Sequence, residues 1–322
     1  MIKIDVKDKK ILSLLDENAR YTNSQIAKRV HLSKPAVEYR IQGLVKKGAI
    51  FSHYTVINFT KLGYSQYKIY FKFQNTSMDE EKKMINYWIN DKNSIWVGEM
   101  RGRWDLAVSV LSKSNFEFGR ILGKFMNHFS KFILEKDILL TEYSPVYSRE
   151  YLAQGKERKK FEFIYGVPER IYELDEIDRR ILKEISNNTR ATIIEISGKL
   201  NLSRDVINYR MKKLLKDKII IQFRTFPNLE NLGIKFYKII VRTKNFNETE
   251  EEKMKDYVRN NKKVTQLLKL IGSWDLELEI ESENEDELYG IISDIRKNFS
   301  EVIRDFDILR ITKTHKYNYF PF

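Results

Sequence analysis

The sequence predicts an α+β protein that contains one two-part unit twice, a winged helix-turn-helix domain followed by a ferredoxin-like βαββαβ domain. Residues 22–48 have the pattern of two short helices joined by a tight turn. The same pattern returns at residues 192–218, and a shift of 170 residues aligns the two halves over about 140 residues without an insertion. After residue 63 the apolar period changes from helical to alternating, which indicates that strands begin there.

Each unit is expected to begin with three short helices. Apolar residues at helical spacing follow a pair of acidic residues at the start of each copy, which predicts the first helix. Thr22 and Thr192 each precede a side chain suited to a capping box, so the second helix should begin directly after them. His31 and Asn201 then stand where the turn needs a left-handed backbone, which both residue types tolerate.

The helix after the turn is expected to have one buried and one outward face. Apolar residues recur along it at i, i+4 and i+7 in both copies, which predicts a buried stripe. The other face is polar, as in a helix that enters the major groove of DNA. The candidate DNA-binding residues are Ser33, Lys34, Pro35, Glu38, Tyr39, Arg40, Gln42 and Lys46 in the first copy, and Ser203, Arg204, Asn208, Tyr209, Arg210, Lys212 and Lys216 in the second. A three-helix packing unit with a solvated outer face would show the same spacing.

Arg40 and Arg210 leave two roles open, because each lies at the edge of the buried stripe. Either arginine could hold a DNA phosphate. Either could instead pair within its own domain, Arg40 with Asp8 and Arg210 with Asp178.

The remaining elements follow in the order βαββαβ in each copy, after a β-rich segment that fits a wing. In the first copy they are a wing at 50–58, a strand at 67–73, a helix around 84–89, two short strands on either side of residue 102, a helix at 118–129 and a strand at about 137–143. The predicted domains are winged helix-turn-helix domains at 1–60 and 173–230, βαββαβ domains at 61–150 and 231–322, and a linker at 151–172.

The composition favours an anionic partner. The net charge is +13, and residues 1–60 alone carry eleven Lys and Arg against five Asp and Glu, whereas residues 231–322 have a net charge of −1. Positive charge is therefore enriched where the first helix-turn-helix lies, as contact with phosphates requires. Cysteine is absent and no apolar run approaches the length of a membrane span, so a cytoplasmic protein without a membrane partner is expected.

The pattern I-A-x-x-V-x-L-S-x-x-x-V-x-x-R-I-x-x-L-x-x-x-G-x-I at residues 26–50, together with G-x-W-D in the βαββαβ domain, resembles the Lrp/AsnC (feast/famine) transcription regulators. The resemblance covers each half nearly end to end and implies two fused copies. It implies sequence-specific DNA binding and a second domain, called RAM, that pairs with its neighbour and in many members binds amino acids. The second copy departs from the pattern at Lys218 and carries Asp205 near the start of the recognition helix, which weakens the expectation that it binds DNA.

The resemblance also suggests where an amino-acid effector would bind, since effectors of the family bind near the strand loops where the sensing domains meet. The candidate effector residues are Arg101, Gly102, Arg103, Trp104, Asp105, Gly272, Ser273, Trp274 and Asp275. Arg101 or Arg103 could hold a carboxylate. The alternative is structural: the glycine turns the hairpin, the tryptophan packs and the aspartate caps the turn.

An enzyme is a second interpretation, because siroheme decarboxylases are built from two Lrp-like chains. Their chemistry needs histidine and basic groups around a tetrapyrrole, whereas His31, His53, His128 and His315 are scattered here over turn, wing, helix and tail. No acid–base pair, metal-ligand spacing or phosphate loop stands out, so neither a cofactor nor a metal is expected. An architectural DNA-binding protein without an effector is a third interpretation.

The linker is long enough for the two halves to pair with each other. Residues 154–160 are polar and basic, whereas residues 161–165 could add a strand. We therefore expect an intramolecular pseudo-dimer that binds an imperfect, AT-rich palindrome with half-sites about one helical turn, ~34 Å, apart. Further association through the sheets or through the aromatic tail at 317–322 is an additional expectation, and that tail could equally cover its own core.

Overall fold

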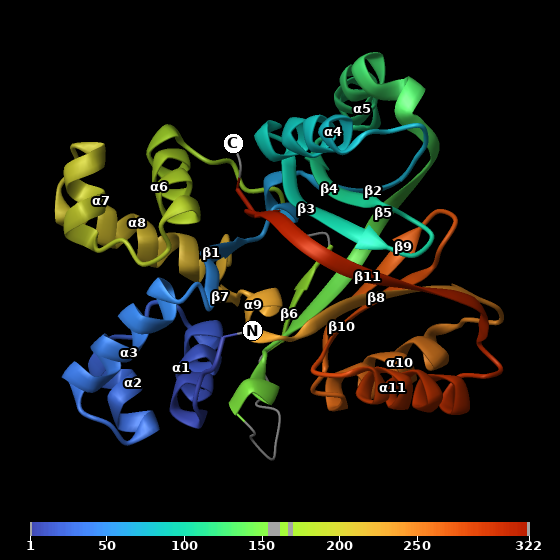
Figure 1. The fold of residues 1–322 in the computed structure, drawn as a ribbon. Helices are drawn as coiled ribbons and strands as arrows, with labels where there is room; N and C mark the ends of the chain where they lie inside the picture. Colours follow the sequence, from blue (N-terminus) through green and yellow to red (C-terminus); the bar gives the residue numbers. More distant parts are fainter. Residues whose placement is uncertain (1, 154–161, 167–169, 321–322) are drawn as a thin grey trace.

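The computed structural model describes residues 2–153, 162–166 and 170–320. Two helical heads lie on one side of the molecule, and a β-sheet body with helices packed on it lies on the other (Figure 1). We call residues 2–49 head 1 and residues 170–219 head 2. The two halves of the body are body 1, residues 58–153, and body 2, residues 228–320.

Each head consists of three short helices whose limits follow from local capping. They are α1 (Val6–Glu17), α2 (Asn23–Val30) and α3 (Lys34–Lys46) in head 1, and α6 (Glu176–Asn187), α7 (Ile193–Leu200) and α8 (Arg204–Lys216) in head 2. Thr22 and Thr192 form the predicted capping boxes at the starts of α2 and α7. His31 and Asn201 adopt the left-handed backbone, with φ of 53° and 54°. The predicted helix-turn-helix is confirmed in both copies.

The strand expected as the wing of each head is present, and its partner is the equivalent strand of the other copy. β1 (Ile50–Ile57) and β7 (Ile220–Pro227) pair antiparallel in a two-stranded sheet of their own, which we call the shared ribbon. Each head supplies a single strand after its last helix, so the backbone groups of that strand find their partners across the pseudo-dimer. The ribbon connects the two heads to each other and to the body (Figure 1).

The body contains two βαββαβ units in the predicted order. Body 1 comprises β2 (Ser65–Phe73), α4 (Met78–Asn90), β3 (Ser94–Arg101), β4 (Leu106–Ser112), α5 (Asn115–Phe129) and β5 (Ile133–Tyr147). Body 2 comprises β8 (Lys235–Thr243), α10 (Glu248–Asn260), β9 (Val264–Ile271), β10 (Leu276–Ser282), α11 (Glu285–Asn298) and β11 (Ile303–Tyr317). Short helical segments join these elements: η1 (Thr60–Leu62), η2 (Ser130–Phe132), η3 (Glu150–Ala153) and α9 (Leu229–Leu232).

Strand pairing joins both halves of the body into one closed sheet. The order is β2-β4-β3-β11-β8-β10-β9-β5, and β5 also pairs with β2, which closes the ring. β3 pairs with β11 and β9 pairs with β5, so each half contributes an edge strand to the other. The two βαββαβ units therefore pair within one polypeptide, and β6 (Glu162–Tyr165) is the strand expected from the linker, added to β5.

The last strand of each half is longer than the sequence predicted. β5 and β11 each span 15 residues, whereas only about 137–143 was expected for the first copy. The first part of each strand pairs within its own half, with β2 or β8, and the second part pairs with the other half. A strand with two successive sets of partners extends over both, which the apolar alternation of one segment does not indicate.

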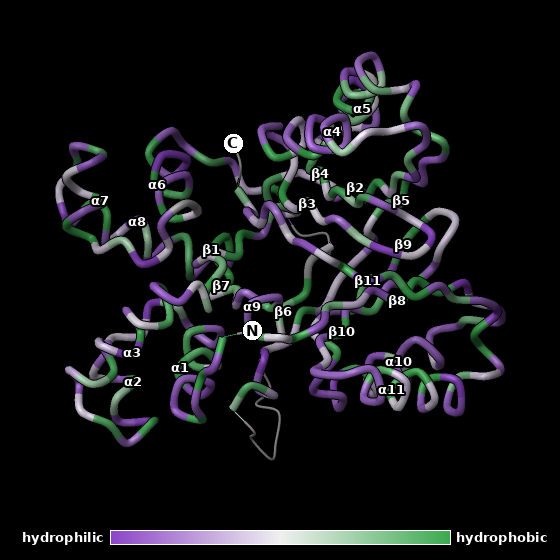
Figure 2. Tube along the Cα trace, in the orientation of Figure 1, coloured by the Kyte–Doolittle hydropathy of each residue, from purple (hydrophilic) through white to green (hydrophobic). Residues whose placement is uncertain are grey.

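Apolar residues lie on both sides of the closed sheet. α4 and α5 cover body 1 through a core around Phe71, Trp88 and Phe125, and α10 and α11 cover body 2 in the same way. A third core extends from the heads through the ribbon to the enclosed side of the sheet. Figure 2 shows the result, with hydrophobic stretches along the central strands and alternating colours along the outer helices.

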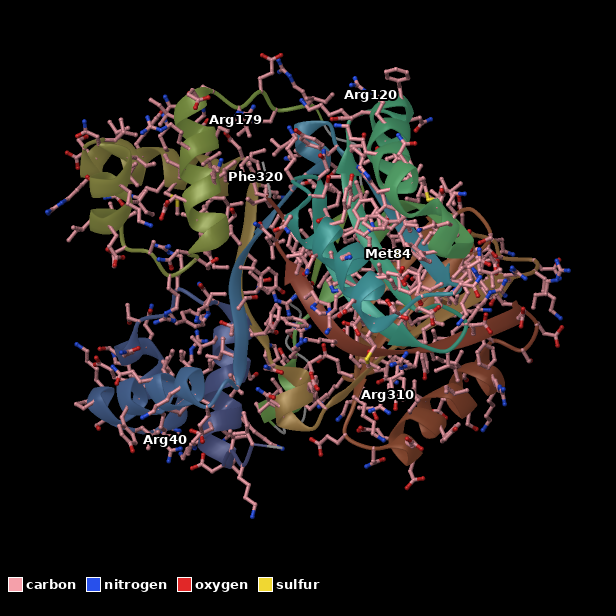
Figure 3. All side chains as sticks on the ribbon, turned by 45° about the horizontal axis from the view of Figure 1, so that its top comes forward. Arg40, Met84, Arg120, Arg179, Arg310 and Phe320 are labelled. Carbon is pink, nitrogen blue, oxygen red and sulfur yellow. The ribbon has the colours of Figure 1, made fainter. Side chains whose placement is uncertain are left out.

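The end of the described chain packs onto this third core. Tyr319 and Phe320 are buried, and Phe320 lies between head 2 and the body in Figure 3. The backbone oxygen of Phe320 accepts a hydrogen bond from Ser186 Oγ of α6 at 3.2 Å. Of the two roles considered for the tail, covering the chain's own core is the one observed for residues 317–320. Within the described residues no helix has the length and apolarity needed to cross a membrane.

Candidate nucleic-acid interface

The outward faces of α3 and α8 are open to solvent. Tyr39 and Tyr209, at equivalent positions, are 78% and 66% exposed. Their exposed neighbours on these faces are Ser33, Lys34, Pro35, Glu38, Gln42 and Lys46 in head 1, and Ser203, Arg204, Asn208, Lys212 and Lys216 in head 2. The opposite side of each helix is buried against its head, so the predicted division into an inner and an outer face is observed.

Basic side chains on these faces are available to a duplex. Lys34 and Lys46, near opposite ends of α3, form no ion pair with any described residue, and the same holds for Lys212 and Lys216 on α8. The positive end of the helix dipole at the start of α3 and of α8 also favours an anion there, although Ser33 and Ser203 cap one backbone amide each. In head 2 the exposed carboxylate of Asp205 lies in this first turn and opposes that effect.

Arg40 and Arg210 do not belong to the outward set. Arg40 Nη1 lies 2.7 Å from both Asp5 Oδ2 and Asp8 Oδ1 of α1 and its cap. Arg210 is paired in the same way with Asp175 and with Asp178. The internal ion pair, one of the two roles left open by the sequence, is therefore the one that the structure shows.

The pKa values agree with this assignment. The hydrogen bonds that Arg40 donates to Asp8 and Asp5 raise its pKa, and the hydrogen bond that Arg210 donates to Asp175 raises the pKa of Arg210. A guanidinium held by two carboxylates contributes little net positive charge to a phosphate nearby. In this structure both arginines are thus engaged within their own heads.

The heads are held against each other by contacts that the sequence analysis missed. Arg20 Nη1 donates to Thr189 O at 2.7 Å, and Arg190 Nη1 donates to Ala19 O at 2.5 Å. The only signal in the sequence was that the two arginines are equivalent under the shift of 170. These reciprocal bonds cross from one head to the other next to the shared ribbon, so α3 and α8 keep one relative orientation.

A buried ionic network ties head 1 to the body. Asp16 of α1 pairs with Arg224 of β7 at 2.6 Å and with Arg149, after β5, at 3.1 Å. Arg149 also pairs with Glu281 of β10 at 2.8 Å. Although burial opposes ionisation, Arg224 and Arg149 hold the pKa of Asp16 below its usual value. The equivalent positions in the other half are uncharged, with Ser186 in place of Asp16, so the two heads are attached differently.

The Gly-x-Trp-Asp turns are largely structural. Trp104 and Trp274 are buried, with at most 1% of their surface exposed. Asp105 accepts from the backbone N–H of Phe73 at 2.8 Å, and Asp275 caps Thr243 in the same way. These four residues therefore have the packing and capping roles that were the alternative to effector binding.

The two glycines of these turns face the other half of the body. Gly102 and Gly272 have φ of 126° and 150°, where a side chain would be strained. A Cβ on Gly102 would lie 3.0 Å from Ile308 O of β11, and a Cβ on Gly272 would lie 3.1 Å from Ile138 O of β5. Glycine is thus needed for the close contact between the halves rather than for a ligand.

The polar residues beside the turns are mostly engaged. Arg103 lies 3.3 Å from Glu135 and 3.6 Å from Asp307, and Ser273 Oγ donates to Asp137. Arg101, at the end of β3, is exposed and forms no ion pair with a described residue. Of the predicted effector set, Arg101 is the side chain left available to a carboxylate.

The histidines do not converge on one place. His53 of β1 shares a 2.8 Å hydrogen bond with Thr225 of β7, and His315 of β11 pairs with Glu99 of β3. In the described ranges, no group of three or more histidine, aspartate or glutamate side chains could hold a metal ion.

Comparison with known proteins gives matches to regulators. A family model described as a winged helix-turn-helix DNA-binding domain matches residues 4–50 and 174–221. The HTH-type transcriptional regulator PH1916 of Pyrococcus horikoshii is 32% identical over 123 residues, which are 38% of this chain and 81% of that protein. The regulator LrpA of the same organism is 44% identical over 62 residues, which are 19% of this chain and 44% of LrpA.

A solved structure matches the whole chain. The siroheme decarboxylase NirDL superposes with a TM-score of 0.62 at 13% identity, covering 97% of this chain and 92% of that chain. At this identity the likeness shows a shared fold alone. On the evidence of two DNA-binding matches and of whole-unit similarity to a regulator, the chain belongs to the Lrp/AsnC family of helix-turn-helix transcriptional regulators, with two copies of the family's unit in tandem.

Proposed function

We propose that this regulator binds one DNA duplex through α3 and α8 together, with the tandem chain taking the place of a dimer. The observation that carries the proposal is the pair of exposed polar helix faces on heads that are bound to each other by the ribbon and by Arg20 and Arg190. Two reading helices in a constant orientation suit two half-sites about one helical turn, ~34 Å, apart.

The two heads should bind with unequal strength. The outward face of α3 carries Lys34 and Lys46 and lies within the more basic segment, residues 1–60. The face of α8 carries Asp205 in its first turn, where a carboxylate repels the phosphate backbone. We therefore infer an imperfect palindrome in which head 1 occupies the stronger half-site, in DNA that is AT-rich.

Phosphate contact by α3 can be tested through salt dependence. Each lysine that neutralises a phosphate adds roughly 0.9 to the slope of log affinity against log salt, so Lys34→Ala with Lys46→Ala should lower the slope by about 2. The control is Lys83→Ala with Lys124→Ala, two exposed lysines on the body helices α4 and α5. An unchanged slope in the first variant would reject this docking.

An amino-acid effector is proposed on the basis of the resemblance to the family and of Arg101. This exposed guanidinium beside the turn could hold a carboxylate bidentately. Calorimetry with the twenty amino acids should then detect binding that Arg101→Ala abolishes and that Lys136→Ala, an exposed cation on β5, leaves intact. No heat with any of them would make the turn purely structural.

A tetrapyrrole enzyme is the second candidate function, and the whole-chain likeness to NirDL favours it. Titration of the chain with an iron tetrapyrrole discriminates between the two functions. A saturable shift in the absorption spectrum at stoichiometric protein would support the enzyme. A retarded band with DNA and an unshifted spectrum would support the regulator.

A further inference from the structure

The two halves of the body differ at one sheet edge. In body 1 the second part of β5, residues 144–147, has β9 on one side and the linker strand β6 on the other. In body 2 the second part of β11, residues 314–317, pairs with β3 on one side. Its pairing with β8 ends at Ile311 and Phe236, and among the described residues no strand continues along that side.

In body 1 the linker continues from this edge in close contact with the sheet. Gly166, with φ of 91°, lies so close to β5 that a Cβ there would be 2.0 Å from Glu142 O. Farther on, Ile171 packs near Gly63, with side-chain carbons 3.8 Å and 3.9 Å from the position of a Cβ on that glycine. The described linker residues thus contact body 1 at two places, the edge of β5 and the start of body 1.

The backbone contact between the linker and the start of body 1 has an equivalent in body 2. In body 1 the N–H of Tyr172 donates to Lys61 O at 2.7 Å, and in body 2 the N–H of Ile2 donates to Asn231 O at the same distance. The shift of 170 relates both pairs. The two halves therefore share the contact at which each head begins.

A cavity of about 470 Å³ lies at this place in body 2. Its lining includes Gly233 and Thr312, which are the equivalents of Gly63 and Glu142 on the linker path. The cavity thus lies at the counterpart of the place where Gly166 and Ile171 of the linker contact body 1. Because β6 is an extended segment added to β5 next to this place, the internal repeat indicates an extended peptide as the occupant in body 2.

The cavity combines an apolar wall with positive charge. Its apolar residues are Phe51, Phe226, Leu229, Ile234, Phe236 and Ile311. Arg310, labelled in Figure 3, and Lys313 are exposed and form no ion pair with a described residue. Lys235 pairs with Glu285 at 2.9 Å, and Glu230 is the one carboxylate among the lining residues. The charge complementary to this lining is negative.

We propose that the open edge of β11 and this cavity bind an extended acidic segment of another protein, which adds to the sheet as an antiparallel strand. Main-chain bonds to residues 314–317 would supply affinity, as β6 does on β5. The close approach of Gly166 to β5 requires a glycine where the partner crosses Thr312. An apolar residue belongs three positions earlier, as Phe163 is buried in β6.

A second copy of the chain fits this edge less well. Symmetric antiparallel pairing of two copies over residues 312–317 would place Lys313 of each copy opposite Lys316 of the other, and like charges directly opposite each other oppose association. Charge therefore selects an acidic partner over self-pairing.

The probe for this proposal is a fluorescent peptide with the linker sequence 161–172 in which Arg170 is replaced by glutamate. This peptide has three acidic residues, no basic one, and the glycine. We expect saturable binding by fluorescence anisotropy, weakened about tenfold or more by Arg310→Glu with Lys313→Glu. The matched control, Lys297→Glu with Arg304→Glu, reverses two exposed cations elsewhere on body 2 and should bind normally.

A second peptide, with valine in place of the glycine, separates strand addition from simple charge attraction. We expect at least a tenfold loss for it, because a Cβ would collide with the backbone of β11. The proposal is overturned by absence of saturable binding, by equal binding of the charge-reversed chain, or by equal binding of the valine peptide. Sedimentation that finds a dimer of the chain, dissolved by Arg310→Glu with Lys313→Glu, would instead assign the edge to a second copy.

Discussion

Arg20 of head 1 and Arg190 of head 2 are equivalent residues that each donate to a backbone carbonyl of the opposite head. Burial lowers the pKa of both guanidinium groups, and Arg190 lowers the pKa of Arg20 further by its charge. Two like charges are thus held close together because each has a carbonyl partner across the interface. These two bonds connect the heads directly, beside the shared ribbon.

The first prediction concerns this joint. Arg20→Ala with Arg190→Ala should reduce the affinity for a duplex with two half-sites by about tenfold or more, because the second contact loses its high effective concentration. Affinity for a single half-site should stay unchanged. Gel-shift titrations with duplexes selected from random-sequence DNA would measure both, and an equal loss on both duplexes would contradict the joint role.

The second prediction separates the role of Arg40 from phosphate contact. Arg40→Gln removes two charge-assisted bonds to Asp5 and Asp8, so the free energy of unfolding should fall by about 1 to 2 kcal/mol. The slope of log DNA affinity against log salt should equal that of the chain without the substitution, whereas Lys34→Ala should lower this slope. Urea unfolding and salt titration measure the two effects, and a reduced slope with normal stability would restore Arg40 to the DNA interface.

The third prediction concerns charges inside the closed sheet. Lys68 of β2 and Lys238 of β8 are equivalent, both are buried, and both donate to Glu277 of β10. Lys238 also donates to Glu279, so Glu277→Gln would leave the buried Lys68 ammonium as the one without a carboxylate, and stability should fall by about 3 to 5 kcal/mol. Burial lowers the pKa of Lys68 to about 8, against the attraction of Glu277, so this lysine would lose its proton first.

A double variant provides the control for this network. Glu277→Gln with Lys68→Met removes the uncompensated charge and should recover part of the lost stability. The equivalent of Glu277 in body 1 is Ala107, so an uncharged residue fits the backbone at this position. Equal urea midpoints for the single and double variants would show that the lysines do not depend on this carboxylate.

The fourth prediction is a pH dependence of the shared ribbon. Burial, with a contribution from Arg190, lowers the pKa of His53 from 6.5 to about 4. The unfolded chain therefore binds the proton first as the pH falls, and stability is lost between pH 6.5 and 4, by up to about 3 kcal/mol. The unfolding free energy of His53→Gln should lack this pH-dependent loss. The difference between the unfolding free energies of the two proteins should change over that range, and a constant difference would contradict it.

Some features of the molecule follow from short stretches of sequence. The capping boxes at Thr22 and Thr192, the turns at His31 and Asn201 and the outward position of Tyr39 depend on residues within one or two helical turns. Residue type and spacing therefore determined the helix limits and the polar face before any contact between elements was known.

Other features depend on contacts between distant segments. The spacing of residues within β1 or β7 does not indicate that the two strands pair with each other. The role of Arg40 likewise depended on two carboxylates 35 and 32 residues away in the sequence. The sequence left Trp104 as a candidate effector-binding residue, and only the tertiary structure shows that its side chain is buried.

By itself, the sequence determined that the chain is a duplicated DNA-binding head and split βαββαβ body, because periodicity, capping and repetition are properties of the chain. Only the tertiary structure decided that the halves close into one sheet, that the heads share a ribbon, and that the linker fills an edge in body 1 whose counterpart on β11 is open. The physical reason is that the backbone groups of a strand edge accept any strand, so their partner is chosen by packing and charge across the assembled fold.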